Sequence, residues 1–469
     1  MSLPSPQVFR ITHTHFDPVN RTARLYYAFD DGPALEETLE FPRAPDDAND
    51  GDLTPLQLAG FRNCLHHLHI AAGVSYYKLF VPRQISIETA PLTALELSFY
   101  RQFYVHGLAE FAYVNGLDLR HHFSLRARPD AAGYHPVALP PSGRALVPVG
   151  GGKDSIVTLE ALKAAGKAFS LFAVGQHPHI EKVAQMADIP LLRVRRRLAA
   201  QLFEYNRAGA LNGHVPITGI ISFILACASV LHRCDRLIMS NERSADEPNM
   251  TGADDFSINH QYSKTYRFER AFDELLRQRL LPNSRYFSLL RPLSEIKIAQ
   301  LFAGLAHYHP TFASCNRSVQ LDRSGALRWC CACPKCRFVF LLLAPFMPRQ
   351  QLTNIFGADL LADSKQVAGY LDLLGLGEHK PFECVGEYAE SLSLVAALSE
   401  QEQWREASVV QALSQAVETA NAAALPALAR PLREHLTCTE APGIPPAYEQ
   451  CIGELERVIW SADRGVGIR

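Results

Sequence analysis

The sequence predicts an α/β protein with an open, mostly parallel sheet, preceded by a mixed α/β region and followed by a helical one. Apolar strand patterns alternate with helical patterns after residue 145, as in sheets whose helices cover both faces. The chain of 469 residues is also too long for a single core. A proline- and glycine-rich stretch at 129–143 and a purely helical pattern from about 346 divide it. We therefore expect domains at residues 1–135, 136–345 and 346–469.

The N-terminal region combines strands and helices. Turn residues separate three strand-like segments, which predicts a β-meander. An amphipathic helix, a strand region broken at Pro82 and an aromatic-rich helix follow it. In order, these segments are 8–16, 23–29, 37–41, 56–72, 75–88 and 95–115. This region carries no motif of recognised chemistry.

A glycine loop opens the central region. The apolar run 146–149 predicts a buried strand, and the pattern from Ile156 onward predicts a helix. Between them stand Gly150, Gly151, Gly152, Lys153, Asp154 and Ser155. Glycines let the backbone approach an anion, and the helix N-terminus adds about half a positive charge. The loop is not a Walker P-loop, because Val147 stands where glycine is needed and Asp154 where Ser or Thr is needed.

A second polar group follows another predicted strand. Strands are expected at 169–174, 191–194, 236–240 and 286–290, with a long apolar helix at 217–232. Ligands of open α/β sheets bind beyond the carboxyl ends of the strands. Asn241, Glu242 and Arg243 come directly after such an end, so they are candidates for the substrate pocket. A polar surface loop is the alternative.

Four cysteines show the spacing of a metal site. Cys315, Cys330, Cys333 and Cys336 can bring four thiolates to one tetrahedral ion, which predicts a structural zinc. Cys331 could replace Cys330, and a set of reduced thiols is the alternative. The 11 cysteines of the chain are then thiols or metal ligands of a cytoplasmic protein, not disulfides.

Composition argues against two kinds of partner. The net charge of −2 gives no reason to expect nucleic-acid binding, and the arginines at 193 and 195–197 are expected on a solvated face. The sequence has no signal-peptide pattern and no apolar run of about 18 residues, so membrane insertion is not expected. The expected partner is a small-molecule substrate; the oligomeric state stays open.

The C-terminal region is predicted to be helical at 358–374, 388–398, 409–423 and 447–459. A loop of ionisable residues at 377–387 interrupts it and contains His379 and Cys384. Loops with such clusters often carry function. Cys384 beside His379 could gain or lose a proton, although a partly buried free cysteine is the alternative.

The glycine loop closely resembles the S-G-G-x-D-S loop of PP-loop ATP pyrophosphatases, with Gly150 in place of the first serine. The cysteine arrangement resembles the zinc site of 7-cyano-7-deazaguanine synthases, which carry the same type of loop. The resemblance implies a PP-loop fold that splits ATP into AMP and pyrophosphate. Residues 150–155 would bind ATP, Asp154 would help to hold Mg²⁺, and Lys297, on a helix after a proline, would lie near the phosphates.

The whole chain resembles the UDP-N-acetylmuramoyl-L-alanyl-L-glutamate epimerases of peptidoglycan synthesis. The matching segments are V-P-V-G-G-G-K-D-S, G-H-V-P at 213–216, S-N-E-R-S-A at 240–245, W-C-C-A-C-P-K-C at 329–336 and H-K-P-F-E-C-V-G at 379–386. The resemblance implies that ATP adenylates the terminal L-Glu, after which a base and an acid invert its α-carbon. Lys153 and Asp154 would assist at the phosphates, and Cys384, His379 and His214 are the candidates for base and acid. The alternatives are an amide- or nitrile-forming enzyme that uses ammonia, and a zinc-dependent scaffold with a degenerate loop.

Overall fold

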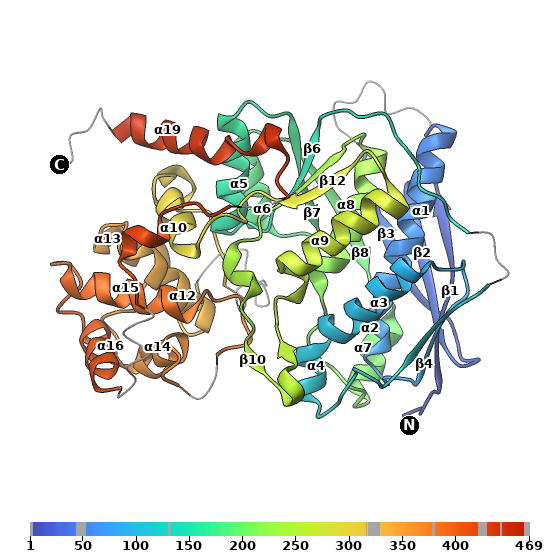
Figure 1. The fold of residues 1–469 in the computed structure, drawn as a ribbon, viewed down its shortest axis with the longest axis horizontal. Helices are drawn as coiled ribbons and strands as arrows, with labels where there is room; N and C mark the ends of the chain where they lie inside the picture. Colours follow the sequence, from blue (N-terminus) through green and yellow to red (C-terminus); the bar gives the residue numbers. More distant parts are fainter. Residues whose placement is uncertain are drawn as a thin grey trace.

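The structure is a computed structural model of the chain (Figure 1). It describes residues 3–43, 53–129, 133–315, 317, 329–377, 380–420, 429–440 and 443–463. His379, one of the predicted acid–base candidates, lies outside these residues.

One ten-stranded sheet organises the fold, in the order β12-β9-β6-β7-β8-β3-β2-β1-β4-β5. Neighbouring strands are parallel from β12 to β8 and from β1 to β5, and antiparallel from β8 to β1. The prediction of an α/β protein with a mostly parallel sheet is therefore confirmed. The strands are β1 (Val8–Asp17), β2 (Thr22–Phe29), β3 (Leu35–Glu40), β4 (Gln84–Ile87), β5 (Ser124–Ala127), β6 (Ala145–Pro148), β7 (Phe169–Val174), β8 (Leu191–Arg197), β9 (Arg236–Met239) and β12 (Arg285–Ser288). A separate hairpin pairs β10 (Met250–Thr251) with β11 (Ser257–Ile258).

The N-terminal meander joins the central strands through β3 and β8. Thr38 to Glu40 pair with Arg197 to Arg195, so the sheet continues across the expected division at residue 135. The expectation of a solvated arginine run is wrong for Arg196, whose side chain is only 9% exposed and contacts Glu37 at 2.7 Å (Nε to Oε1). A paired charge can lie in this junction where an unpaired one could not.

Helices cover both faces of the sheet, as expected for alternating strands and helices. Leu146 of β6 belongs to the apolar cluster that contains α1 (Pro55–Ala72) and α8 (Ile217–Leu231). Its neighbour Val147 belongs to the opposite cluster, with α5 (Lys153–Ala164), α10 (Glu295–Ala303) and α19 (Cys451–Asp463). Figure 1 shows α8 and α9 (Tyr266–Leu275) on one side of β6 and β7, with α5 and α6 (Pro178–Ala187) on the other.

The helices of the N-terminal region follow the sequence prediction with one exception. Thr54 caps α1 in a reciprocal capping box with Gln57. The region predicted as strands over 75–88 begins instead within the short helix α2 (Val74–Tyr77), and only β4 is a strand. The aromatic segment forms α3 (Ala94–Gly107) and α4 (Ala109–Val114), as expected.

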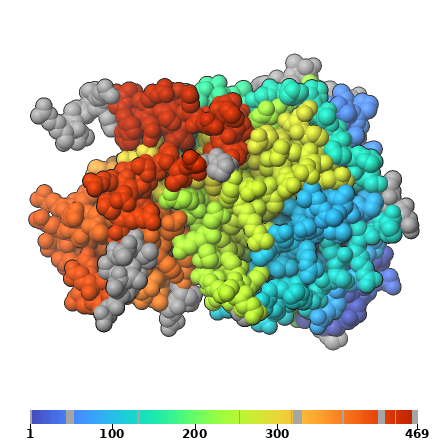
Figure 2. All heavy atoms as spheres, in the orientation of Figure 1, coloured from blue at the N-terminus to red at the C-terminus, as the bar shows by residue number. Residues whose placement is uncertain are grey.

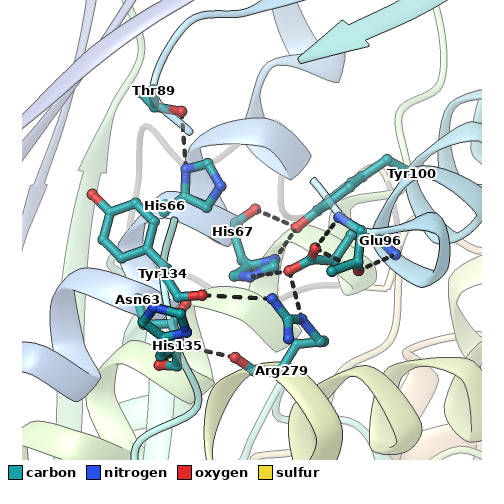
Figure 3. A network of polar contacts seen from close by, with 10 residues as sticks. Asn63, His66, His67, Thr89, Glu96, Tyr100, Tyr134, His135 and Arg279 are labelled. Atoms are coloured by element: carbon teal, nitrogen blue, oxygen red, sulfur yellow. Dashed lines mark hydrogen bonds and ion pairs between the residues drawn. The ribbon is translucent and has the colours of Figure 1, made fainter. Parts of the chain in front are cut away.

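A buried polar network fastens this region to a distant part of the chain (Figure 3). Glu96 of α3 accepts from Arg279 in η4 (Leu276–Leu280) at 3.1 Å and lies 3.4 Å from His67 Nε2 of α1. The other His67 ring nitrogen, Nδ1, lies 2.7 Å from the Tyr100 hydroxyl. Asn63 donates to the Arg279 carbonyl at 2.8 Å, so polar contacts hold α1, α3 and η4 together.

The C-terminal region is helical and packs against the α5 and α10 side of the sheet. Its helices are α12 (Pro334–Leu343), α13 (Arg349–Phe356), α14 (Val367–Leu373), α15 (Tyr388–Glu400), α16 (Ser408–Thr419), α18 (Leu432–His435) and α19. Figure 2 shows them as one orange and red mass on the side opposite the blue N-terminal strands. In the part of the chain that the structure describes, no helix combines the length and apolarity that a membrane crossing requires.

Candidate active site

A cavity of about 430 Å³ opens at the carboxyl ends of β6, β7 and β9. Parallel strands end at the same edge of a sheet, so the loops that follow them meet there. The polar residues that line the cavity are Asp154, Ser155, His177, His179, Thr218, Ser240, Asn241, Glu242, Gln261, Lys264, Glu295, Ser314, Lys335 and Cys384. The structure therefore brings the glycine loop, two of the predicted substrate residues and Cys384 into one site.

Two of the three glycines in the loop, Gly151 and Gly152, have no room for a side chain. Gly151 has a φ of +77°, and a Cβ there would lie 2.2 Å from Cδ2 of His179. A Cβ on Gly152 would lie 2.7 Å from the Ser314 hydroxyl. Gly150 and Gly152 line the cavity just before α5 begins, so backbone N–H groups and the helix N-terminus are available to an anion.

Lys153 and Asp154 have different positions. Lys153 is buried behind the loop, where its Nζ donates to the carboxylates of Asp154 and Glu295. Burial opposes its charge, but the two carboxylates outweigh that effect and raise the pKa of Lys153. Asp154 lines the cavity, and Lys153 and Lys335 together outweigh its burial and lower its pKa. Asp154 thus presents an ionised carboxylate, a ligand that suits Mg²⁺.

Asn241 and Glu242 line the cavity as predicted from their place after β9, whereas Arg243 does not. The Nε of Arg243 lies 3.7 Å from a carboxylate oxygen of Glu387. Lys297 is also outside the lining, because its Nζ pairs with Glu456 of α19 at 2.5 Å. The lysines that do reach the cavity are Lys264 and Lys335.

Cys384 enters the cavity from the loop between α14 and α15. Its Sγ accepts a hydrogen bond from Lys264 Nζ at 3.0 Å, and Lys335 Nζ donates to its carbonyl oxygen. Burial would raise the pKa of Cys384, but Lys264 and a hydrogen bond with His260 outweigh it and lower the pKa to about 5. The thiol is therefore held as a thiolate near neutral pH, the form that can accept a proton or attack a carbon.

His214 lies near this thiol without lining the cavity. Its Nδ1 is 3.6 Å from a Glu110 oxygen, and the same oxygen lies 2.5 Å from His260 Nδ1. His214 also contacts the His260 ring directly, with ring centroids 4.4 Å apart, so its link to Cys384 runs through His260. Sequence spacing could not show this, because Glu110 belongs to α4 and Cys384 to the C-terminal region.

Several cavity residues were missed at the sequence level. His177 and His179 follow β7 directly, so the rule that identified Asn241 could have found them. Lys335 lies within the cysteine-rich segment, whose spacing predicts metal ligands and gives no separate signal for a lysine. For Lys264 and Glu295, and for His260 outside the lining, the sequence offers no local signal.

The predicted metal ligands also converge. The Sγ atoms of Cys315, Cys330, Cys333 and Cys336 lie within 4.8 Å of one another. Cys331 turns away, and its thiol donates to the Phe356 carbonyl at 3.3 Å. Four soft ligands with no other donor suit a closed tetrahedral zinc site. Cys333 caps α12, so this site adjoins Lys335 of the cavity.

Comparison with known proteins gives two family models and three named relatives. The family model of the MurL N-terminal domain matches residues 2–289, and that of the MurL C-terminal domain matches residues 311–427. Three relatives are each named UDP-N-acetyl-alpha-D-muramoyl-L-alanyl-L-glutamate epimerase. That of Xanthomonas oryzae pv. oryzae (strain MAFF 311018) is 43% identical over 86% of this chain and 88% of its own.

The other two relatives come from different bacteria. The protein of Salinispora tropica is 46% identical over 78% of this chain and 79% of its own. That of Micromonospora sp. (strain ATCC 39149) is 44% identical over 83% of this chain and 86% of its own. Since the N-terminal match alone spans more than half of the residues and both regions match in order, the chain belongs to the MurL family.

Proposed function

We propose that this protein is an epimerase of peptidoglycan synthesis that inverts the terminal L-Glu of UDP-N-acetylmuramoyl-L-alanyl-L-glutamate to D-Glu. The names of its relatives support the substrate and the reaction class. One observation supports the mechanism: a single cavity contains both an anion-binding glycine loop and the Cys384 thiol beside Lys264. The first feature suits activation of a carboxylate, and the second suits transfer of a proton.

The glycine loop is the proposed ATP site, in a PP-loop type of α/β domain. Backbone N–H groups of Gly150 to Gly152 and the α5 N-terminus would hold phosphate oxygens. The α-carboxylate of the substrate attacks the α-phosphorus of ATP, which gives an acyl-adenylate and pyrophosphate. Mg²⁺, held in part by Asp154, would neutralise charge on the phosphates.

Adenylation makes the following proton transfer feasible. Removing an α-proton beside a free carboxylate would place two negative charges on adjacent groups. The mixed anhydride has no such charge, so its α-proton is far more acidic. Cys384 is the proposed acceptor, because its thiolate lies in the same cavity as the glycine loop. Return of a proton to the opposite face and hydrolysis then release the D-epimer and AMP.

The four-cysteine site is the proposed structural zinc site. Its ligands fit zinc by number and type, and no ligand position would remain open for chemistry. It joins the segment after Ala313 and Ser314, which line the cavity, to the start of α12. Its proposed role is therefore to fix the end of the cavity, without a chemical step.

The test is to give the protein the UDP-muramoyl dipeptide, ATP and Mg²⁺ in D₂O. We expect the D-glutamyl epimer, AMP and pyrophosphate without ammonia, and deuterium at the α-carbon of the product. AMP release without deuterium would indicate acyl transfer in place of epimerisation. Inversion without ATP would contradict the role of the glycine loop. Inversion of free glutamate as fast as that of the UDP-muramoyl dipeptide would contradict the proposed substrate, because binding of the remote nucleotide and sugar should be needed to position the reacting carbon.

A further inference from the structure

Four side chains from three separate segments meet beside the cavity. Glu110 comes from α4, His260 and Lys264 from the segment around η3 (Tyr262–Lys264), and Cys384 from the loop before α15. Lys264 Nζ lies 3.0 Å from Cys384 Sγ, and His260 hydrogen-bonds Cys384 as well as Glu110. The thiol therefore has two cationic partners, and one of them is anchored by a carboxylate.

The position of Cys384 is fixed by other contacts. Lys335 donates its backbone N–H to Glu383 at 2.9 Å and its Nζ to the Cys384 carbonyl. Asn249 donates to the Pro381 carbonyl at 2.7 Å, and Lys380 pairs with Glu247 at 3.2 Å. These groups hold the loop from two sides, and Lys264 contacts the thiol itself.

We infer that Lys264, His260 and Glu110 form with Cys384 the proton-transfer device of this enzyme. In this device Lys264 and His260 are positioning residues that stabilise the thiolate as cations, and Glu110 anchors His260 and takes its proton when the sulfur is protonated. The inference deepens the proposed function and rests on it for the reaction. The residues act on the thiol whether or not the substrate is bound.

The charges around the thiol agree with these roles. Lys264, His260 and Lys335 face Cys384, while Glu242 and Asp154 act on Lys264. Burial opposes the charge of His260, but Cys384 and Glu110 outweigh it and raise the pKa of His260 to about 9. Burial lowers the pKa of His214 to about 4, so His214 is neutral at pH 7 and can accept a proton through Glu110.

The transfer balances without any further reagent. The α-proton of the acyl-adenylate moves to Cys384 Sγ, and the C–H electron pair remains on the substrate as an enolate. The sulfur then no longer carries the charge that pairs with His260, and the imidazolium passes its Nδ1 proton to Glu110. The enolate takes a proton from solvent on its opposite face, and loss of the thiol proton to solvent with return of the His260 proton restores the thiolate–imidazolium pair. This route predicts exchange of the α-proton with solvent.

The experiment measures Cys384 alkylation by iodoacetamide against pH in the full-length protein, with mass spectrometry of the Cys384 peptide. Exposed Cys438 is the internal control. In wild type, the rate at about pH 6.5 should be within about twofold of that at about pH 9. Lys264→Met and His260→Gln should each lower the ratio of the alkylation rate at about pH 6.5 to the rate at about pH 9 by about tenfold or more. Lys264→Arg should largely retain this ratio.

The matched control is Lys380→Met, which removes a buried lysine from the same loop without touching the thiol. It should keep the wild-type pH profile even if the absolute rate changes. Unchanged pH profiles of Cys384 alkylation in both Lys264→Met and His260→Gln would overturn the inference. An alkylation rate that falls by the same factor at every pH in these variants would also overturn it. A substrate adduct on Cys384 in intact-mass spectra would make it a nucleophile and also overturn the proposed role. Because alkylation needs no substrate, failure here is separate from failure of the epimerase assay.

Discussion

At the scale of single residues, Asp154 is the side chain on which the proposed activation step most depends. It lines the cavity and also accepts from buried Lys153, which has a second partner in Glu295. We predict that Asp154→Asn stays folded, because the amide oxygen can still accept from Lys153. AMP formation should fall by about a hundredfold or more, since charge stabilisation of phosphates contributes several kcal/mol. Pyrophosphate release and thermal unfolding measure the two effects.

The control for this variant is Glu402→Gln, at an exposed carboxylate far along the chain. It should change neither the rate nor the unfolding temperature. Wild-type pyrophosphate release by Asp154→Asn would remove the loop carboxylate from the proposed mechanism.

Sequence reasoning at this scale succeeded where a local rule applied. Asn241 and Glu242 were identified because polar residues after a parallel strand lie at the ligand-binding edge. The same rule misplaced Arg243, whose side chain turns toward Glu387. Lys264 could not be found in this way, because 120 positions separate it from Cys384 and only tertiary packing brings them together.

At the scale of elements, the start of α12 connects the cysteine site to the cavity. Cys333 caps this helix, and Lys335 in its first turn contacts Glu383 and Cys384. We predict one zinc per chain and its loss in Cys336→Ser, because structural zinc contributes folding energy. Elemental analysis of reduced protein gives the zinc content. Hydrogen exchange should show faster opening at the start of α12 and in the 380–387 loop.

Cys331→Ser is the matched control for the zinc prediction. This neighbouring thiol donates to Phe356 and lies outside the four-sulfur cluster, so the variant should keep its zinc. Absence of metal from carefully purified wild type would end the prediction, and zinc loss in Cys331→Ser alone would reassign the ligands.

Periodic patterns predicted most elements but not those that depend on packing or local capping. The strand at 169–174 matches β7, whose residues are nearly all buried. Val74, Tyr76 and Tyr77 have β-forming side chains, yet they belong to a helical turn inside the N-terminal core. The helix expected at 358–374 is shorter, because Asp363 accepts from the Lys365 N–H and starts a tighter turn before α14.

At the scale of the whole molecule, the pairing of β3 with β8 joins the N-terminal strands to the glycine-loop strands. One apolar cluster contains residues from both, including Phe61 of α1 and Phe223 of α8. The sequence could not reveal this connection, because strand pairing over such a separation leaves no local pattern. The domain division at residue 135 stays a prediction. A shared sheet and a shared core argue that both parts unfold together.

Glu96→Ala tests whether the two parts unfold together, because Glu96 connects α1, α3 and η4 across 183 positions of sequence. Its removal leaves Arg279 without its buried carboxylate partner and also breaks the capping box of α3 with Thr93. We expect a loss of about 2 kcal/mol in the free energy of unfolding, since the Arg279 side chain is partly exposed and keeps some hydration.

Circular dichroism and tryptophan fluorescence in urea should report the same midpoint, because the two parts share one core. The exposed control Glu402→Ala should change stability by less than about 0.5 kcal/mol. Two separated transitions in the variant, with an early one confined to residues 1–135 by limited proteolysis, would show instead that the N-terminal part folds as an independent domain.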